Sequence, residues 1–136
     1  MTENYYSSPA FDIYPVVGIN WSAAKYFCDW RSKLMNSYRK TQGLAALPRF
    51  TLPTESEWEW AARGGRASAK YPWGNPYLSN AKGCLLANFK PHRGNYDADG
   101  YEYTAPANAY SPNDYGLYNM AGNVAEWCED AFEENA

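Results

Sequence analysis

Carboxylate and amide side chains are dense between positions 88 and 126, where they lie among glycines. They are Asn88, Asn95, Asp97, Asp99, Glu102, Asn113, Asp114, Asn119, Asn123 and Glu126. Oxygen ligands presented by loops suit calcium, which takes about six to eight of them in flexible geometry. The alternative is that Asn, Asp and Gly serve here only as turn formers.

The stretch Asn95–Gly100 begins like the calcium loop of an EF-hand. Asn95, Asp97 and Asp99 stand at the first, third and fifth positions, and Gly100 at the sixth, as such a loop requires. The twelfth position should carry a bidentate Glu, but it is Pro106. The sequence therefore excludes a standard EF-hand and leaves another kind of metal loop or a polar turn.

A second candidate cation site lies around Gly122. This glycine stands between small and polar residues and predicts a tight turn, which would point backbone carbonyls inward. Glu126 follows closely enough to add a carboxylate.

Nucleophilic catalysis has little support in the sequence. The single histidine, His92, lies in a basic loop, and no GxSxG, P-loop or HExxH motif is present. Cys28, Cys84 and Cys128 include no CxxC pair, which argues against a thiolate zinc site and leaves their disulfide state open.

The composition is that of one globular domain with unusually many aromatic residues. The chain has 136 residues and a net charge of -3, so nothing global indicates a nucleic-acid partner. Six Trp and 13 Tyr suggest aromatic packing among loops, or a surface that binds protein or carbohydrate. No run is long and apolar enough to span a membrane, and no signal peptide is recognisable.

The longest predicted helix begins at Asn20 or Ser22, either of which can cap it, and fades near Lys40. Asp29 and Lys33 are four residues apart and predict an ion pair on its exposed side. Its apolar residues recur at helical spacing and predict one stripe, made of Ala24, Phe27, Cys28, Leu34 and Met35.

A second helix is predicted from Glu55 to Arg63. Thr54 and Glu57 form a capping box at its start, and the pair Gly64–Gly65 ends it without strain.

A strand is predicted at the short apolar run 14–17, and a second short strand at 48–52. After residue 65, prolines and glycines interrupt every periodic pattern. So long an irregular stretch is uncommon in a compact domain, and bound metal would offset the entropy of ordering it.

Four motifs are specific in combination: YPVVGINWSAA at 14–24, LPTESEWEWAARGG at 52–65, YPWG at 71–74 and NDYGLYNMAGNVAEW at 113–127. Together they resemble the sulfatase-modifying factor family, the formylglycine-generating-enzyme domain. The resemblance implies an α+β, mostly irregular variant of the C-type lectin fold, with two helices, short strands and long calcium-bound loops. It implies an N-terminal extension over 1–13 and a partial domain over 14–136 that lacks its C-terminal segment.

The resemblance also implies two calcium sites. The first takes the side chains of Asn88 and Asp99 and the carbonyls of Phe89 and Tyr101. The second takes the side chains of Asn119 and Glu126 and the carbonyls of Gly122 and Val124. Asn95 and Asp97 then become turn formers, or at most outer-shell groups.

Enzymes of this family oxidise a sulfatase cysteine to formylglycine with copper and two cysteines of a C-terminal segment. Neither Cys84 nor Cys128 matches those positions. The resemblance therefore favours a non-catalytic role, and copper is expected only for the alternative, an enzyme whose catalytic segment is absent here. A lectin-like ligand-binding domain is the other alternative.

Three stretches carry a narrower resemblance: NYYSSPAFD at 4–12, FCDWRS at 27–32 and GCLLANFKPHRGNYDADG at 83–100. They resemble the K-type lipoprotein of gliding motility and type IX secretion. This implies a calcium-stabilised structural subunit of a periplasmic ring at the inner face of the outer membrane. Its partners would be an N-type ring subunit and further copies of itself, with a lipid anchor outside this chain as the only membrane attachment.

Overall fold

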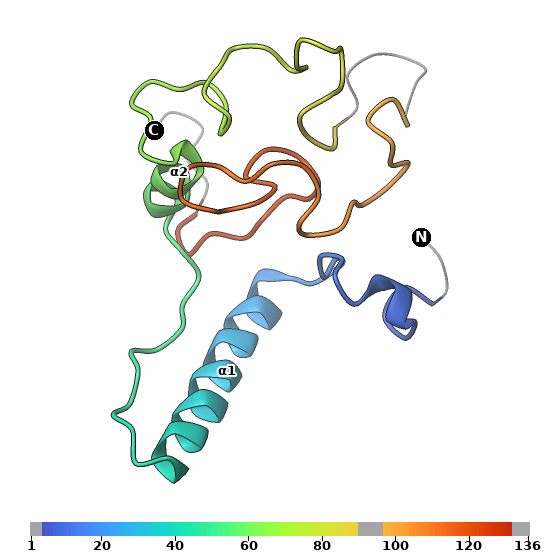
Figure 1. The fold of residues 1–136 in the computed structure, drawn as a ribbon. Helices are drawn as coiled ribbons and strands as arrows, with labels where there is room; N and C mark the ends of the chain where they lie inside the picture. The colour runs from blue at the N-terminus through green and yellow to red at the C-terminus, as the bar shows by residue number, and fades with distance from the viewer. Residues whose placement is uncertain (1–3, 90–96, 132–136) are drawn as a thin grey trace. The chain divides into compact units, whose positions relative to one another are not determined.

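The computed structural model describes residues 4–89 and 97–131, and its regular elements are helices (Figure 1). They are a short 3-10 helix η1 (Pro9–Phe11) and two α-helices, α1 (Trp21–Thr41) and α2 (Glu55–Arg63). The two α-helices confirm the sequence prediction, whereas η1 was not predicted. Proline at its first position and the Ser8 side chain before it account for this short turn.

The predicted strands at 14–17 and 48–52 are wrong. Within the described residues, the only strand-like pairing is an isolated bridge between Ser79 and Leu85. The expectation of little regular structure after the second helix is confirmed, because turns and bends follow one another up to the end of the described chain.

The chain forms two compact units, which are described separately. The helix unit comprises Gly18–Trp58 and Glu126–Ala136 and contains α1. The loop unit comprises Met1–Val17 and Glu59–Ala125. The boundary falls inside α2.

Helix α1 is capped by Asn20, one of the two residues predicted for this role. The Asn20 side chain accepts from the amide of Ala23 at 2.8 Å, which satisfies one of the free amides of the first turn. The positive charges of Arg39 and Lys40 lie in the last turn, where they interact favourably with the negative end of the helix dipole.

The predicted apolar stripe of α1 is only partly confirmed. Ala24 is buried and Cys28 is half-buried, but Phe27 and Leu34 are 52% and 54% exposed. The predicted pair of Asp29 with Lys33 is wrong, since Asp29 pairs with Arg49. On the side where Ser32 lies, α1 meets a returning backbone segment, which also carries Arg49.

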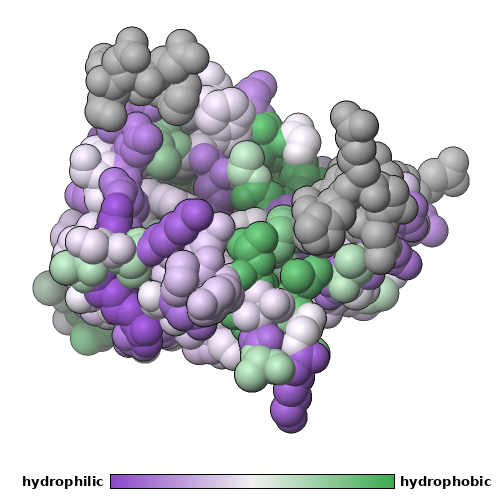
Figure 2. All heavy atoms as spheres, turned by 90° about the horizontal axis from the view of Figure 1, so that it is seen from above, coloured by the Kyte–Doolittle hydropathy of each residue, from purple (hydrophilic) through white to green (hydrophobic). Residues whose placement is uncertain are grey.

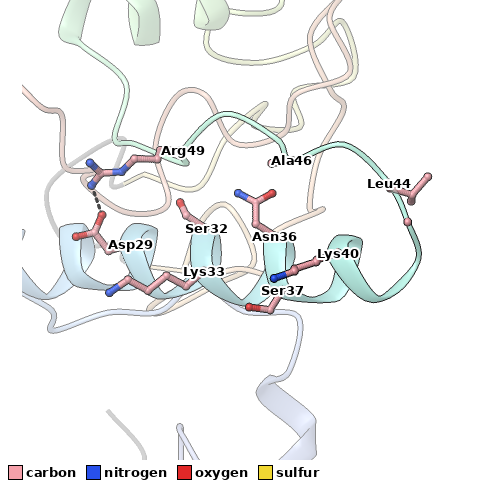
Figure 3. Close-up of a pocket in the computed structure, with 10 residues that line it drawn as sticks. Asp29, Ser32, Lys33, Asn36, Ser37, Lys40, Leu44, Ala46 and Arg49 are labelled. Carbon is pink, nitrogen blue, oxygen red and sulfur yellow. Dashed lines mark hydrogen bonds and ion pairs between the residues drawn. The ribbon is translucent and has the colours of Figure 1, made fainter.

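That segment, residues 44–52, runs back along α1, and polar side chains of the helix point toward it (Figure 3). Ser32 accepts from the amide of Phe50 at 2.8 Å. Asn36 accepts from the amide of Leu47 at 2.8 Å and donates to its carbonyl at 3.1 Å. Helix side chains therefore bind backbone groups that a strand partner would otherwise have to bind, which explains the missing strand.

A pocket of about 900 Å³ lies between α1 and this segment (Figure 3). Lys33, Lys40 and Arg49 contribute its cationic lining, and the one carboxylate, Asp29, is paired with Arg49. On its wall, the Ser32 hydroxyl donates to the Cys28 carbonyl at 2.8 Å.

Helix α2 has the predicted capping box. The Thr54 hydroxyl accepts from the amide of Glu57 at 3.2 Å, and the Glu57 carboxylate accepts from the amide of Thr54 at 2.8 Å. These hydrogen bonds from Thr54 lower the pKa of Glu57.

The loop unit buries small residues and polar side chains rather than large apolar ones. Ala87 and Ala105 are buried, as are Asn88 and Asn113. Among the described residues no large side chain is fully buried. Hydrogen bonds between side chains and backbone must therefore hold much of this unit together.

Many large hydrophobic side chains are exposed instead. Figure 2 shows one face on which hydrophobic side chains lie open between hydrophilic ones. Within residues 4–89 and 97–131, no helix is long and apolar enough to cross a membrane.

Candidate metal-binding loops

The residues of the first predicted site lie together around Asp99. One carboxylate oxygen of Asp99 accepts from the amide of Phe89 at 2.7 Å, and the other accepts from the amide of Tyr101 at 3.1 Å. An ionised carboxylate has about four lone-pair positions, so two remain available to a cation.

Asn88 joins this group from the buried side of the loop. Its Nδ2 donates to the carbonyl of Tyr103 at 2.7 Å and to Oδ1 of Asn123 at 3.3 Å. The Tyr103 carbonyl can only accept, which fixes the orientation of the amide. Within the described parts of the chain nothing donates to Asn88 Oδ1, so this oxygen can serve as a ligand.

Tyr110 is a neighbour of this group that sequence reasoning missed. Its hydroxyl donates to the Asp99 carbonyl at 3.2 Å. Burial, followed by the negative charge of Asp99 and the nearby Tyr101, raises the pKa of Tyr110 to about 12. No sequence signal distinguishes it, because tyrosines are frequent throughout this region.

Asn119, of the second predicted site, carries the clearest sign of an absent partner. Its Nδ2 donates to the carbonyls of Pro106 and Ala107 at 3.0 and 2.9 Å. Its Oδ1 is buried and has no hydrogen-bond partner, the only such side-chain atom in the described chain. Buried polar atoms in native proteins are nearly always paired, so this acceptor needs an explanation, and a cation bound to it would supply one.

Gly122 and Val124 follow in a tight turn. The amide of Val124 donates to the carbonyl of Gly122 at 3.0 Å, and Gly122 has φ 81°. A Cβ on Gly122 would collide with the carbonyl oxygen of Asn88, so only glycine allows this close approach.

Glu126, the fourth predicted ligand of the second site, belongs to the helix unit. There its carboxylate is exposed and accepts from Nε1 of Trp58 at 2.8 Å. Three of the four predicted ligands of the second site, Asn119, Gly122 and Val124, therefore belong to the loop unit.

Asn123 is the functional candidate that the ligand prediction passed over. It pairs with Ala105 in both directions: its Oδ1 accepts from the amide at 2.8 Å and its Nδ2 donates to the carbonyl at 3.1 Å. Its φ is 69°, a left-handed conformation that asparagine tolerates better than most residues. The dipeptide Gly122–Asn123 is a turn signal, but it gives no hint of a partner so far away in the chain.

Among the described residues, the Asp97 side chain takes no part in these contacts. Asp97 is exposed, and its carbonyl accepts from the amide of Gly100 at 2.9 Å. Asn95 and His92 lie outside the described residues.

The three cysteines are free thiols. Cys84 is exposed, while Cys28 and Cys128 are half-buried. Burial, together with the charges of Asp130, Glu55 and Glu126, raises the pKa of Cys128, which disfavours the reactive thiolate.

The donor set of the loops is one that calcium accepts. Over 4–89 and 97–131, no three His, Cys, Asp or Glu side chains gather closely enough to hold a metal. The available ligands are instead single carboxylates, asparagine amides and backbone carbonyls. Calcium binds such mixed oxygen donors readily, whereas zinc favours nitrogen and sulfur.

Comparison with known proteins places the chain in a family. Residues 5–136 match the Sulfatase-modifying factor enzyme 1-like domain. The chain belongs to this family, which confirms the family-level prediction from the four motifs.

Its relatives include active and inactive proteins. The formylglycine-generating enzyme of Thermomonospora curvata is 42% identical over 120 residues, which are 86% of this chain and 33% of that protein. The inactive C-alpha-formylglycine-generating enzyme 2 of Bos taurus is 38% identical over 121 residues, 88% of this chain and 34% of that protein. The serine/threonine-protein kinase pkn1 of Chlamydia pneumoniae is 38% identical over 122 residues, but these are only 14% of its length. The chain therefore spans about a third of the formylglycine-generating relatives.

Proposed function

We propose that this chain is a calcium-stabilised, non-catalytic structural module that acts through protein contacts. In the finer form of the proposal it belongs to a ring subunit of the type IX secretion and gliding machinery, in the periplasm at the inner face of the outer membrane. The orphan Oδ1 of Asn119 is the observation that carries the calcium part. The stretch 83–100, which resembles the K-type lipoprotein, supports the finer form.

The first proposed ion is bound by Asn88 Oδ1, the Asp99 carboxylate and the carbonyls of Phe89 and Tyr101. Asp99 already draws the backbone of the two carbonyl donors together through their amides. Calcium would fix loop segments that few apolar contacts hold.

The second proposed ion is bound in the loop unit by Asn119 Oδ1 and the carbonyls of Gly122 and Val124. The family resemblance, rather than the structure, adds the Glu126 carboxylate as a fourth ligand. Two hydrogen bonds from Asn119 Nδ2 hold the amide so that Oδ1 is presented without a protein partner. A bound ion would satisfy this oxygen, which otherwise loses its hydration without compensation.

Protein contact is supported by an exposed stripe on α1, defined by Phe27, Trp30, Leu34 and Tyr38. Their spacing puts them on one face of the helix, opposite Ser32. All of them are exposed, and the rings of Phe27 and Trp30 lie 5.5 Å apart. Aromatic and aliphatic side chains of this kind dominate the energy of protein interfaces.

The non-catalytic reading agrees with the existence of inactive relatives, one of which is the Bos taurus protein. An enzymatic alternative keeps the same fold and would use copper and a cysteine pair outside the 136 residues. Conversion of a cysteine in a sulfatase-derived peptide to formylglycine by the copper-loaded product of the complete gene would overturn the non-catalytic proposal.

Binding to a purified N-type ring subunit tests the finer form. We expect a saturable complex that weakens by at least about tenfold when Phe27 and Leu34 are both replaced by serine. Tyr77→Ser, in the loop unit and 70% exposed, is the matched control and should leave binding unchanged. Absence of any complex, with calcium binding intact, would remove the ring assignment and keep the calcium proposal.

A further inference from the structure

Residues of both proposed calcium sites form hydrogen bonds with the same backbone segment, residues 103–107. Asn88, from the first site, donates to the carbonyl of Tyr103. Asn119, from the second site, donates to the carbonyls of Pro106 and Ala107. Both side chains use their NH₂ group for this contact, which leaves the oxygen of each amide to the ion.

Asn123 occupies the middle of this arrangement. Its two hydrogen bonds with Ala105 pair it with the centre of segment 103–107. Ala105 is 0% exposed, so these bonds are shielded from competing water. Asn123 is not itself a proposed ligand of either ion.

Asn123 also joins the two loops directly. Its amide donates to the Asn88 carbonyl at 2.8 Å, and its Oδ1 accepts from Asn88 Nδ2 at 3.3 Å. Gly122 lies against the same Asn88 carbonyl, where no side chain would fit. Because Asn88 contacts both Gly122 and Asn123, a displacement of Asn88 would also displace the turn that carries the carbonyls of the second site.

The turn at Asn123 is a strained one. The bond from the Val124 amide to the Gly122 carbonyl spans two residues, and Asn123 between them has φ 69°. A three-residue turn with positive φ is rare, and such a conformation persists only when its surroundings hold it in place. The bonds of Asn123 to Ala105 and Asn88 supply that restraint.

We infer that Asn123 is a positioning residue that couples the two calcium sites, so that the ion bound at one raises the affinity of the other. The inference rests on the calcium proposal above. An ion at the first site orders Asn88, and through Asn123 this ordering is shared with the turn of the second site. The second ion then has less chain entropy to remove, which is positive cooperativity without a change of fold.

Calcium titration of the full chain by calorimetry tests the inference. Asp99→Asn removes the first site's carboxylate, and Glu126→Gln removes that of the second site while keeping an acceptor for Trp58. For independent sites, the product of the two stepwise constants of the parent equals the product of the two single-site constants. We expect the parent product to be larger by about fivefold or more.

The parent, Asp99→Asn and Glu126→Gln titrations are repeated with Asn123→Gly added to each chain. In this background, the ratio of the two-site product to the product of the single-site constants should fall close to unity. Glycine keeps the positive φ and removes the side-chain bonds, so both sites should still bind calcium. Ser68→Gly is the matched control, because Ser68 is exposed and also has a positive φ, 61°. It should retain the ratio of the parent.

The outcomes separate the two claims. Two ions bound with a ratio of unity in the parent would overturn the coupling and keep the calcium proposal. A ratio that survives Asn123→Gly would overturn the role of Asn123. No calcium bound by the parent would overturn both. If Asn123→Gly does not melt cooperatively, Asn123→Asp replaces it, because aspartate keeps the acceptor oxygen for Ala105 and Asn88. Asn123→Asp should preserve most of the ratio of the parent. Complete loss of the ratio in Asn123→Asp would also count against the role of Asn123.

Discussion

Among the described asparagines of the loop unit, Asn119 is distinguished by an amide oxygen that is buried and has no hydrogen-bond partner. The same side chain makes two structural hydrogen bonds through Nδ2, so truncating it removes both a clamp and a proposed ligand. The two effects can be separated, because only the second depends on calcium.

We predict that Asn119→Ala lowers the melting temperature with and without calcium, but abolishes most of the calcium-dependent increase contributed by the second site. Thermal melts in calcium and in chelator, compared variant by variant, measure the difference. Asn108→Ala is the control, since Asn108 is exposed and makes no side-chain hydrogen bond in the described structure. A calcium increment equal to that of the parent would remove Asn119 from the ligand set.

The raised pKa of Tyr110 leads to a second prediction, on the pH dependence of stability. Its pKa is raised to about 12, whereas in the unfolded chain it titrates near the ordinary value for tyrosine, about 10. Between these values the unfolded chain has released the proton and the folded chain has kept it. Stability therefore falls as pH rises through this window, and the contribution of Tyr110 is fully present only below it.

Tyr110→Phe should make the alkaline loss of stability shallower than in the parent. Urea unfolding at about pH 9 and about pH 11 gives the comparison, in a range that brackets the lower of the two pKa values. Tyr77→Phe is the control, because Tyr77 is 70% exposed and its hydroxyl has no described partner. Identical pH dependence in parent and Tyr110→Phe would show that burial does not hold this proton.

At the scale of elements, the end of α2 depends on one buried side chain, Asn113. Its Nδ2 donates to the carbonyls of Ala61 and Ala62 at 2.7 and 3.2 Å. Its Oδ1 accepts from the amides of Tyr115 and Leu117, both at 3.0 Å. Asn113 thus binds the last turn of the helix to the loop that leads to the proposed second site.

We predict that Asn113→Ala destabilises the chain by about 2 kcal/mol or more, because it leaves buried carbonyls and amides unpaired. Asn80→Ala is a closely matched control. Asn80 Oδ1 also accepts from the amides two and four residues later, at 2.9 and 3.0 Å, but Asn80 is exposed and caps no helix. Chemical denaturation of both variants measures the difference, and equal losses would refute a special role for Asn113.

The helices could be predicted because their signals are local. Thr54 and Glu57 lie three residues apart, and Asn20 caps the turn that it precedes. The strands could not be excluded from the sequence, because nothing in the run 48–52 shows that Ser32 of α1 binds its backbone.

The candidate loops show the same limit. The family motifs placed Phe89, Asp99 and Tyr101 on one site, and the structure brings these residues together. The contacts of Asn123 with Asn88 span 35 positions, and no periodicity or turn rule connects residues so distant. Sequence reasoning therefore finds ligand types and turns, while the hydrogen bonds that position them require the fold.

At the scale of the whole molecule, the small apolar core makes the chain dependent on other sources of order. Within residues 4–89 and 97–131, the buried hydrophobic residues are Tyr5, Ala24, Ala62, Ala87 and Ala105, four of them alanines. Alanine buries little apolar surface, so its contribution to stability is small. An ion that binds only the folded chain adds stability that grows with its concentration.

Removal of calcium should therefore lower the melting temperature of the full chain by several degrees. At a hundredfold excess over the dissociation constant, one bound ion stabilises the folded state by about 2.7 kcal/mol. Magnesium should restore little of this, because it demands a regular octahedral site that irregular carbonyl loops do not provide. The measurement is calorimetric melting in chelator, followed by return of calcium or magnesium to the same sample. Asp99→Asn combined with Glu126→Gln serves as the control and should melt at one temperature under all conditions. If the parent also melts at one temperature throughout, calcium does not order these loops, and the aromatic contacts and asparagine hydrogen bonds hold them unaided.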